Sequence, residues 1–114
     1  FHSPLIARAG EWLAQEFSKV EFADAVIPVV SNVDAKPVLN SDQIKRNLTN
    51  QVTSSVLWVD TIKYMSNNGV KIYLEFGPQK VLSGMVKVID KEALCFNVDK
   101  LEDIEKVISE LESL

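Results

Sequence analysis

The stretch KIYLEFGPQKVLSGMVKVIDKEALCFNV, residues 71–98, decides the fold class of this chain. Its two ends, KIYLEF and LCFNV, have the β-branched and aromatic content of short strands. Between them Gly77-Pro78 breaks the first strand, and residues 79–90 carry apolar side chains at helical spacing. Strands and helices that alternate with short connections are typical of a mixed α/β fold.

The N-terminal part of the chain continues this alternation. We expect a helix from Ser3 to Lys19, in which Ser3 is the N-cap, Pro4 is the first helical residue and Trp12 belongs to the core. The apolar run at residues 25–30 predicts a strand covered on both faces, as in a mostly parallel sheet. Residues 31–40 predict a turn-rich loop with a short hairpin around residues 34–36.

Two further helices are expected between this loop and residue 71, and one more at the C-terminal end. Residues 41–51 form the first, capped by Ser41, and residues 56–67 the second, ended by Asn68 or Gly69 in a left-handed conformation. Asp99 and Glu102 have the spacing of a capping box before the last helix. That helix is expected to bury Leu101, Ile104, Ile108 and Leu111.

Bulk composition excludes several classes of protein. The chain has 114 residues, 46% of them hydrophobic and 25% charged, which suits one globular domain or a large piece of one. A net charge of −4 argues against nucleic-acid binding. One cysteine (Cys95) and one histidine (His2) exclude an internal disulfide and a Cys/His zinc cluster. Without a long apolar run or a leader peptide, we expect a cytoplasmic protein that does not bind membranes.

Four motifs occur in order along the chain: FHSPL at 1–5, PVVSNV at 28–33, the NQV…SVLW segment at 50–58 and EFGPQKVLSGMVK at 75–87. Together they resemble the C-terminal part of the malonyl-CoA:acyl carrier protein transacylases, over about residues 1 to 89. The resemblance implies that residues 1–114 are the C-terminal segment of the large, hydrolase-like subdomain of an acyltransferase. In that subdomain, layered helices lie on a mostly parallel sheet.

The resemblance also implies a reaction, the transfer of malonyl from malonyl-CoA to the phosphopantetheine thiol of acyl carrier protein in fatty-acid synthesis. No cofactor is required, and a malonyl-serine ester is the intermediate. His2 matches the family's general base, although a lone histidine is by itself more often an ordinary surface residue. Gln51 matches the residue whose main-chain carbonyl orients the imidazole, the task of Asp in a triad. Phe1 matches a position where an aromatic ring accompanies selection of malonyl over methyl-branched units.

Two groups that the family needs are absent from these residues. There is no G-x-S-x-G elbow, and neither Arg8 nor Arg46 lies in the motif of the arginine that binds the malonyl carboxylate. We therefore expect both groups in an N-terminal half outside this chain, and we expect the chain to be inactive alone. Its expected partners are that half, malonyl-CoA and acyl carrier protein.

Other interpretations remain open from the sequence. The chain could come from the acyltransferase domain of a polyketide or multifunctional fatty-acid synthase, or be a non-catalytic α/β interaction module. Lys80, Lys87 and Lys91 suit either a solvated helix face or a docking site for acidic carrier protein. The FGPQK segment (residues 76–80) reads most simply as a structural turn and helix start, with Pro78 in the first turn, and Asn32 as a brace of its loop.

Overall fold

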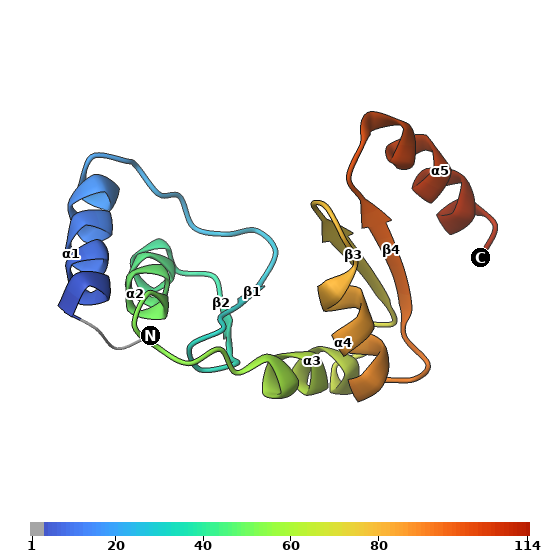
Figure 1. The fold of residues 1–114 in the computed structure, drawn as a ribbon, viewed down its shortest axis with the longest axis horizontal. Helices are drawn as coiled ribbons and strands as arrows, with labels where there is room; N and C mark the ends of the chain where they lie inside the picture. The colour runs from blue at the N-terminus through green and yellow to red at the C-terminus, as the bar shows by residue number, and fades with distance from the viewer. Residues whose placement is uncertain (1–3) are drawn as a thin grey trace. The chain divides into compact units, whose positions relative to one another are not determined.

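A computed structural model describes residues 4–114 (Figure 1). The predicted α/β class is confirmed, and the contacts divide the chain into two compact units, residues 1–64 and 65–114. No helix within 4–114 has both the length and the apolar character needed to cross a membrane. The elements are α1 (Pro4–Ser18), β1 (Val29–Val30), β2 (Pro37–Val38), α2 (Ser41–Gln51), α3 (Trp58–Asn67), β3 (Ile72–Phe76), α4 (Val81–Ile89), β4 (Leu94–Val98) and α5 (Leu101–Glu112).

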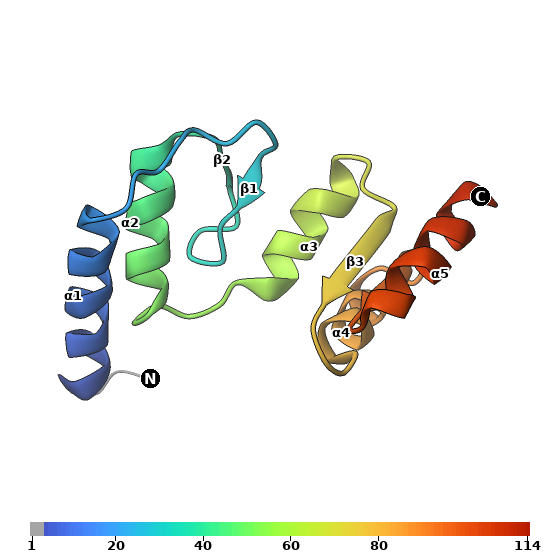
Figure 2. The ribbon, with the colours of Figure 1, turned by 90° about the horizontal axis from the view of Figure 1, so that it is seen from above.

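The N-terminal unit is organised around α1 and α2, which lie side by side and run in opposite directions (Figures 1 and 2). Gly10 is the buried residue of α1 and lies against Thr49 and Val52 at the end of α2. Toward the other end of the pair, the rings of Phe17 and Phe22 pack edge to face, with their centroids 5.2 Å apart. The Lys45 ammonium lies over the Phe22 ring, 4.9 Å from its centroid. The pairing therefore places the start of α1 and the end of α2 at the same end of the helix pair, with Gly10 beside the end of α2 (Figure 2).

The expected strand at 25–30 is much shorter than predicted. Only Val29 and Val30 form β1, which pairs with β2 antiparallel, and Val29 lies opposite Val38. This is the short hairpin expected around residues 34–36, with Ala35 in its turn at φ 56°. Val26 and Ile27 are 96% and 78% exposed, so the expectation of a strand covered on both faces is wrong for these residues.

The C-terminal unit contains the strand–helix–strand arrangement expected from residues 71–98. β3 and β4 pair in parallel, from Ile72 beside Leu94 to Phe76 beside Val98. α4 connects them and packs on both strands, while α5 packs on β4. Val86 of α4 and Val107 of α5 supply buried core residues together with Ala93.

One face of the β3–β4 pair is entirely apolar. Side chains on adjacent parallel strands share a face when their residues pair, and successive residues alternate between faces. Ile72, Leu74 and Phe76 therefore share a face with their partners on β4, and Phe76 is 73% exposed. We refer to this set as the apolar sheet face; it comprises Ile72, Leu74, Phe76, Leu94, Phe96 and Val98.

The N-caps of α2 and α5 each lie one residue from the predicted position. The N-cap of α2 is Asn40, whose Oδ1 accepts from Gln43 N at 3.0 Å, and Ser41 is already helical. At α5 the N-cap is Lys100, and Asp103 Oδ2 accepts from Lys100 N at 2.9 Å. The predicted Asp99–Glu102 capping box is therefore displaced by one residue. Asn68 and Gly69 were the two residues predicted to adopt a left-handed conformation after α3, and the structure shows that it is Gly69.

Two predictions of burial are wrong within this chain. Trp12 is 62% exposed, although the sequence placed it in the core. In α5, three of the four residues predicted to be buried are exposed instead, Leu101 at 85%, Ile104 at 43% and Ile108 at 49%, and the buried residue is Val107. An apolar face is therefore present on α1 and on α5, as the periodicity indicates, but residues 4–114 leave it largely exposed.

Candidate active site

The candidate site begins at the C-terminal end of α2, where Gln51 is the last helical residue. Its side chain is half-buried. The chain then turns tightly. In this turn the main-chain oxygen of Asn50 accepts hydrogen bonds from Thr53 N at 3.2 Å and from Ser54 Oγ at 2.6 Å. Among the described residues, the Gln51 carbonyl accepts from Ser54 N alone, at 3.4 Å. That bond is long, so the Gln51 carbonyl retains capacity for a stronger donor.

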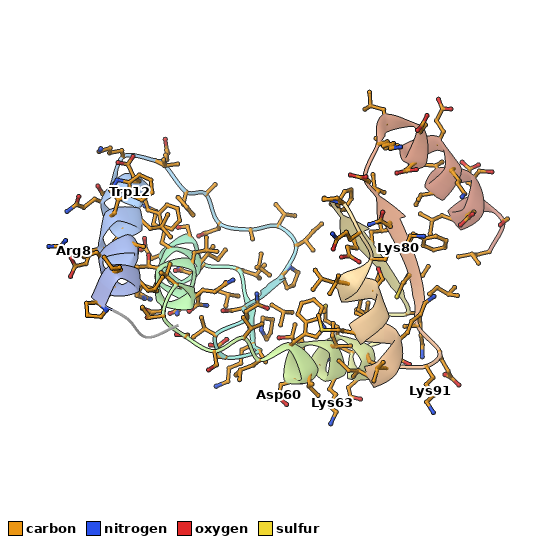
Figure 3. The ribbon with its side chains drawn as sticks, in the orientation of Figure 1. Arg8, Trp12, Asp60, Lys63, Lys80 and Lys91 are labelled. Carbon is orange, nitrogen blue, oxygen red and sulfur yellow. The ribbon has the colours of Figure 1, made fainter. Side chains whose placement is uncertain are left out.

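The orientation of α1 bears directly on the sequence prediction. α1 begins at Pro4, two residues after His2, and its start lies at the same end of the helix pair as Gln51 (Figure 2). His2 and Phe1 themselves lie outside the described residues, so their assigned roles stay predictions. Arg8 projects from α1 away from α2 (Figure 3).

A cavity of about 170 Å³ adjoins Gln51 between α2 and the β1–β2 hairpin. Its wall combines aliphatic and polar residues. Asn32, which the sequence suggested as a loop brace, is among them, and its main-chain oxygen accepts from Leu57 N at 2.9 Å. The lining consists of Val29, Val30, Ser31, Asn32, Val38, Ile44, Asn47, Leu48 and Gln51.

Asn47 is the buried polar residue of this helix, at 7% exposure. Its Oδ1 accepts from Gln43 Nε2 at 2.9 Å, and Gln43 Oε1 accepts in turn from Arg46 Nη2 at 2.8 Å. The Nδ2 group of Asn47 is buried and has no partner among the described residues. Sequence periodicity does not reveal this arrangement, because it locates the apolar side chains of a helix and not the hydrogen-bond partners of its polar ones.

The FGPQK segment has the structural role that the sequence favoured. Asn97 on β4 donates its Nδ2 hydrogens to three main-chain oxygens of this region, those of Glu75 at 3.2 Å, Gly77 at 3.1 Å and Gln79 at 2.9 Å. Gly77 adopts φ 126°, which favours glycine. Pro78 is not in the first turn of α4, because the helix begins at Val81.

Glu75 anchors the start of α4. Its carboxylate accepts from Leu82 N at 3.2 Å, Ser83 N at 2.8 Å and Ser83 Oγ at 2.6 Å. The hydrogen bond from the Ser83 side chain is the main reason that the pKa of Glu75 is lowered from its ordinary value. Ser83 therefore acts as a structural donor that joins the start of α4 to β3.

A second cavity, in the C-terminal unit, is lined in part by lysines and a cysteine. This cavity of about 230 Å³ is lined by Lys80, Ser83, Gly84, Lys87, Cys95 and Asn97. Lys80, Lys87 and Lys91 are exposed, and Figure 3 labels the first and last of them. Burial is the largest cause of the raised pKa of the Cys95 thiol, and a raised pKa disfavours the nucleophilic thiolate form.

Comparisons with known proteins give a consistent result. No protein-family model matches the chain. The malonyl CoA-acyl carrier protein transacylase of Synechocystis sp. is 38% identical over 104 residues, which are 91% of this chain and 36% of that protein. The transacylase of Staphylococcus aureus is 34% identical over the same share of this chain and 34% of its own length.

Solved structures agree with these sequence matches. The crystal structure of the Clostridium perfringens transacylase matches with a TM-score of 0.85 and 37% identity, covering 99% of this chain and 36% of that chain. A malonyl-transacylase in complex with its type II PKS acyl-carrier protein matches with a TM-score of 0.83 and 29% identity, covering 96% of this chain and 35% of that chain. The present chain spans about a third of the length of the relatives it matches. By sequence and by fold, it corresponds to a segment of the malonyl CoA-acyl carrier protein transacylases.

Proposed function

We propose that this segment works within an enzyme that transfers malonyl from malonyl-CoA to the phosphopantetheine thiol of acyl carrier protein, in cytoplasmic fatty-acid synthesis. The observation that carries the proposal is the antiparallel packing of α1 and α2. It brings the start of α1, which directly follows the FHS sequence, to the end of the helix pair where Gln51 ends α2. The names of the relatives support the same reaction.

In the proposed reaction His2 acts as general base. Its neutral imidazole removes the proton of a serine hydroxyl on the remaining polypeptide, and the oxygen attacks the thioester carbon of malonyl-CoA. The carbon–sulfur bond then breaks, and the imidazolium gives its proton to the leaving thiolate of CoA. In the second half-reaction the carrier-protein thiol attacks the malonyl-serine ester, with His2 again removing and returning one proton. The serine is regenerated, and no cofactor is consumed.

The Gln51 carbonyl is proposed to hold the other imidazole nitrogen as an N–H donor. This fixes the tautomer that leaves the nitrogen facing serine unprotonated. A carbonyl carries no full charge, so we expect it to raise the histidine pKa less than a carboxylate would. The long bond from Ser54 N leaves the carbonyl able to accept the imidazole hydrogen.

Phe1 is proposed to set the choice of acyl group. An aromatic ring immediately before the base would occupy the space that an α-methyl group needs. Because a hydrophobic pocket distinguishes one methyl group by roughly 1–3 kcal/mol, the preference for malonyl would be strong but incomplete. Replacing Phe1 by Ser is expected to raise the relative rate with methylmalonyl-CoA.

The test uses the complete protein that carries this segment, supplied with radiolabelled malonyl-CoA and phosphopantetheinylated acyl carrier protein. We expect label to appear first on a serine of the enzyme and then on the carrier protein, with methylmalonyl-CoA slower in the native protein and less disfavoured in Phe1→Ser. The isolated 114-residue chain is expected to transfer no label. A complete protein that lacks a G-x-S-x-G elbow and never becomes labelled would instead establish a non-catalytic interaction module.

A further inference from the structure

Gly10 is the buried residue of α1 and faces the end of α2. A Cβ atom placed on Gly10 would lie 3.9 Å from the main-chain oxygen of Thr49, 3.9 Å from Val52 Cβ and 4.0 Å from Val52 Cγ1. These are ordinary van der Waals distances for one methyl group. A side chain that branches at Cβ would extend beyond that methyl into Val52 and the α2 main chain, and would force the helices apart.

The residues that Gly10 faces flank Gln51 on both sides. Thr49 lies two residues before Gln51, and Val52 directly follows it. On the other helix, Gly10 lies six residues after Pro4, which corresponds to about 9 Å of a rigid helix. A change in helix separation at Gly10 is therefore transmitted to both sides of the candidate site, the start of α1 and the end of α2.

We propose that Gly10 is a positioning residue for the acyl transfer. The space at this position admits a methyl group but no branched side chain, and we infer that this limit keeps the helix separation at which the His2 imidazole can donate to the Gln51 carbonyl. This inference rests on the proposed function, because it gives a task to a residue that touches neither substrate nor the reacting atoms. A hydrogen bond tolerates only a few tenths of an ångström, so a small displacement is sufficient to break it.

The experiment compares four variants of the complete protein with the native form: Gly10→Ala, Gly10→Val, Val52→Ala and the double variant Gly10→Val/Val52→Ala. The rate of malonyl-enzyme formation at saturating malonyl-CoA, the KM for malonyl-CoA and the pH profile of the rate are measured. Gly10→Ala is the matched control, because its methyl group fits without displacement. Val52→Ala removes the methyl groups opposite Gly10, so the double variant restores space for the helices to approach.

We expect Gly10→Ala to react at nearly the native rate. Gly10→Val is expected to lower the rate of ester formation on the order of 100-fold, the effect of misplacing a reacting group by about 1 Å, with KM for malonyl-CoA little changed. Its apparent pKa in the pH profile is expected to fall, since the imidazolium loses the carbonyl that stabilises it. The double variant is expected to recover most of the rate and the native pH profile.

A native rate and pH profile in Gly10→Val would overturn the positioning role. So would a double variant that melts at the native temperature but remains slow, and this variant keeps the test decisive if Gly10→Val alone does not fold. The variant His2→Ala, measured beside them, separates this inference from the function itself. If His2→Ala is slow while Gly10→Val is fast, only the role of Gly10 fails; if His2→Ala reacts at the native rate, the proposed function fails.

Discussion

Gln79 adopts φ 72° in the turn that precedes α4, a conformation that favours glycine. The helical spacing of residues 79–90 predicted a helix from this position, but α4 begins two residues later, at Val81. A left-handed conformation costs a non-glycine residue about 1–2 kcal/mol, and the greater freedom of unfolded glycine offsets about 0.5–1 kcal/mol of that.

Gln79→Gly is therefore expected to raise the free energy of unfolding by about 0.5–1 kcal/mol. Urea titration of the complete protein measures this, with Lys80→Gly as a control because φ of Lys80 is −136°. A loss of stability in Gln79→Gly equal to that of the control would show that the left-handed conformation is not what limits stability there.

The ionised Glu75 carboxylate makes the stability of the start of α4 depend on pH. Its folded pKa lies below the ordinary value, chiefly because Ser83 Oγ donates to the carboxylate. The stabilisation is therefore complete above the unfolded pKa and is lost as the pH falls through the folded pKa. Ser83→Ala is expected to raise the Glu75 pKa and to move the acid loss of stability to higher pH.

NMR titration of the Glu75 carboxyl carbon in native protein and in Ser83→Ala measures this shift directly. Ser66→Ala is a suitable control, because Ser66 Oγ donates to Asp90 at 2.9 Å and not to Glu75. An unchanged Glu75 pKa in Ser83→Ala would show that the Ser83 hydroxyl is not the dominant cause.

At the scale of single elements, the caps of the helices can be tested separately from their packing. Asn40, and not the predicted Ser41, caps α2. Asn40→Ala is expected to lower the free energy of unfolding by about 1 kcal/mol, since Gln43 N loses its acceptor. Ser41→Ala is expected to have little effect, because Ser41 N bonds to Asp24 through its main chain.

Chemical denaturation of the two variants distinguishes these assignments. Equal losses from both substitutions, or a larger loss from Ser41→Ala, would restore the sequence-based prediction and contradict the observed cap.

The sequence predicted the positions of helices and strands better than the residues that they contact. Periodicity and turn residues located β4 at its observed bounds and α2 to within one residue of its N-cap, because these signals depend on neighbours a few residues apart. Asn97, whose amide joins three main-chain oxygens around Gly77, could not be found in this way, because its partners lie about 20 residues away along the chain. Gly10 was similarly missed, since a lone glycine in a helix has many explanations apart from close packing.

The candidate site was predicted from motifs and not from periodicity. Gln51 was assigned from resemblance alone, and the structure adds that α2 ends at this residue. The expected burial of Trp12 and Leu101 failed because apolar spacing identifies a face but not what covers it.

At the scale of the whole molecule, the isolated chain exposes much apolar surface. The apolar sheet face includes Phe76 at 73% exposure and Leu74 at 43%, and α5 adds Leu101 at 85%. Exposed strands and apolar faces of this kind promote association. We expect the isolated 114-residue chain to self-associate at micromolar concentration and to show a melting temperature that depends on concentration.

Analytical ultracentrifugation over a range of concentrations tests this, with Phe76→Ser expected to weaken association and Glu105→Ser, at an exposed charged position, expected to leave it unchanged. A sharp, concentration-independent transition of a monomer would be incompatible with this view of the exposed faces.

Recognition of the carrier protein also belongs to the whole molecule. A related malonyl-transacylase has been solved in complex with its acyl-carrier protein, and the exposed Lys80 and Lys87 line one cavity in the present chain. If they attract an acidic carrier protein, reversing both charges should slow transfer most at low salt, where electrostatic steering is greatest. Unchanged transfer at low salt would leave these lysines as an ordinary solvated helix face.

The most direct measurement of the central claim is the single-turnover rate at which the complete protein forms its malonyl ester, in native form and with His2→Ala. General-base catalysis contributes roughly 100- to 10,000-fold, so a loss of that size is predicted. The substitution should leave the affinity for malonyl-CoA nearly unchanged, because the imidazole acts on the serine proton and not on the thioester. Ester formation at the native rate without the imidazole would contradict the account.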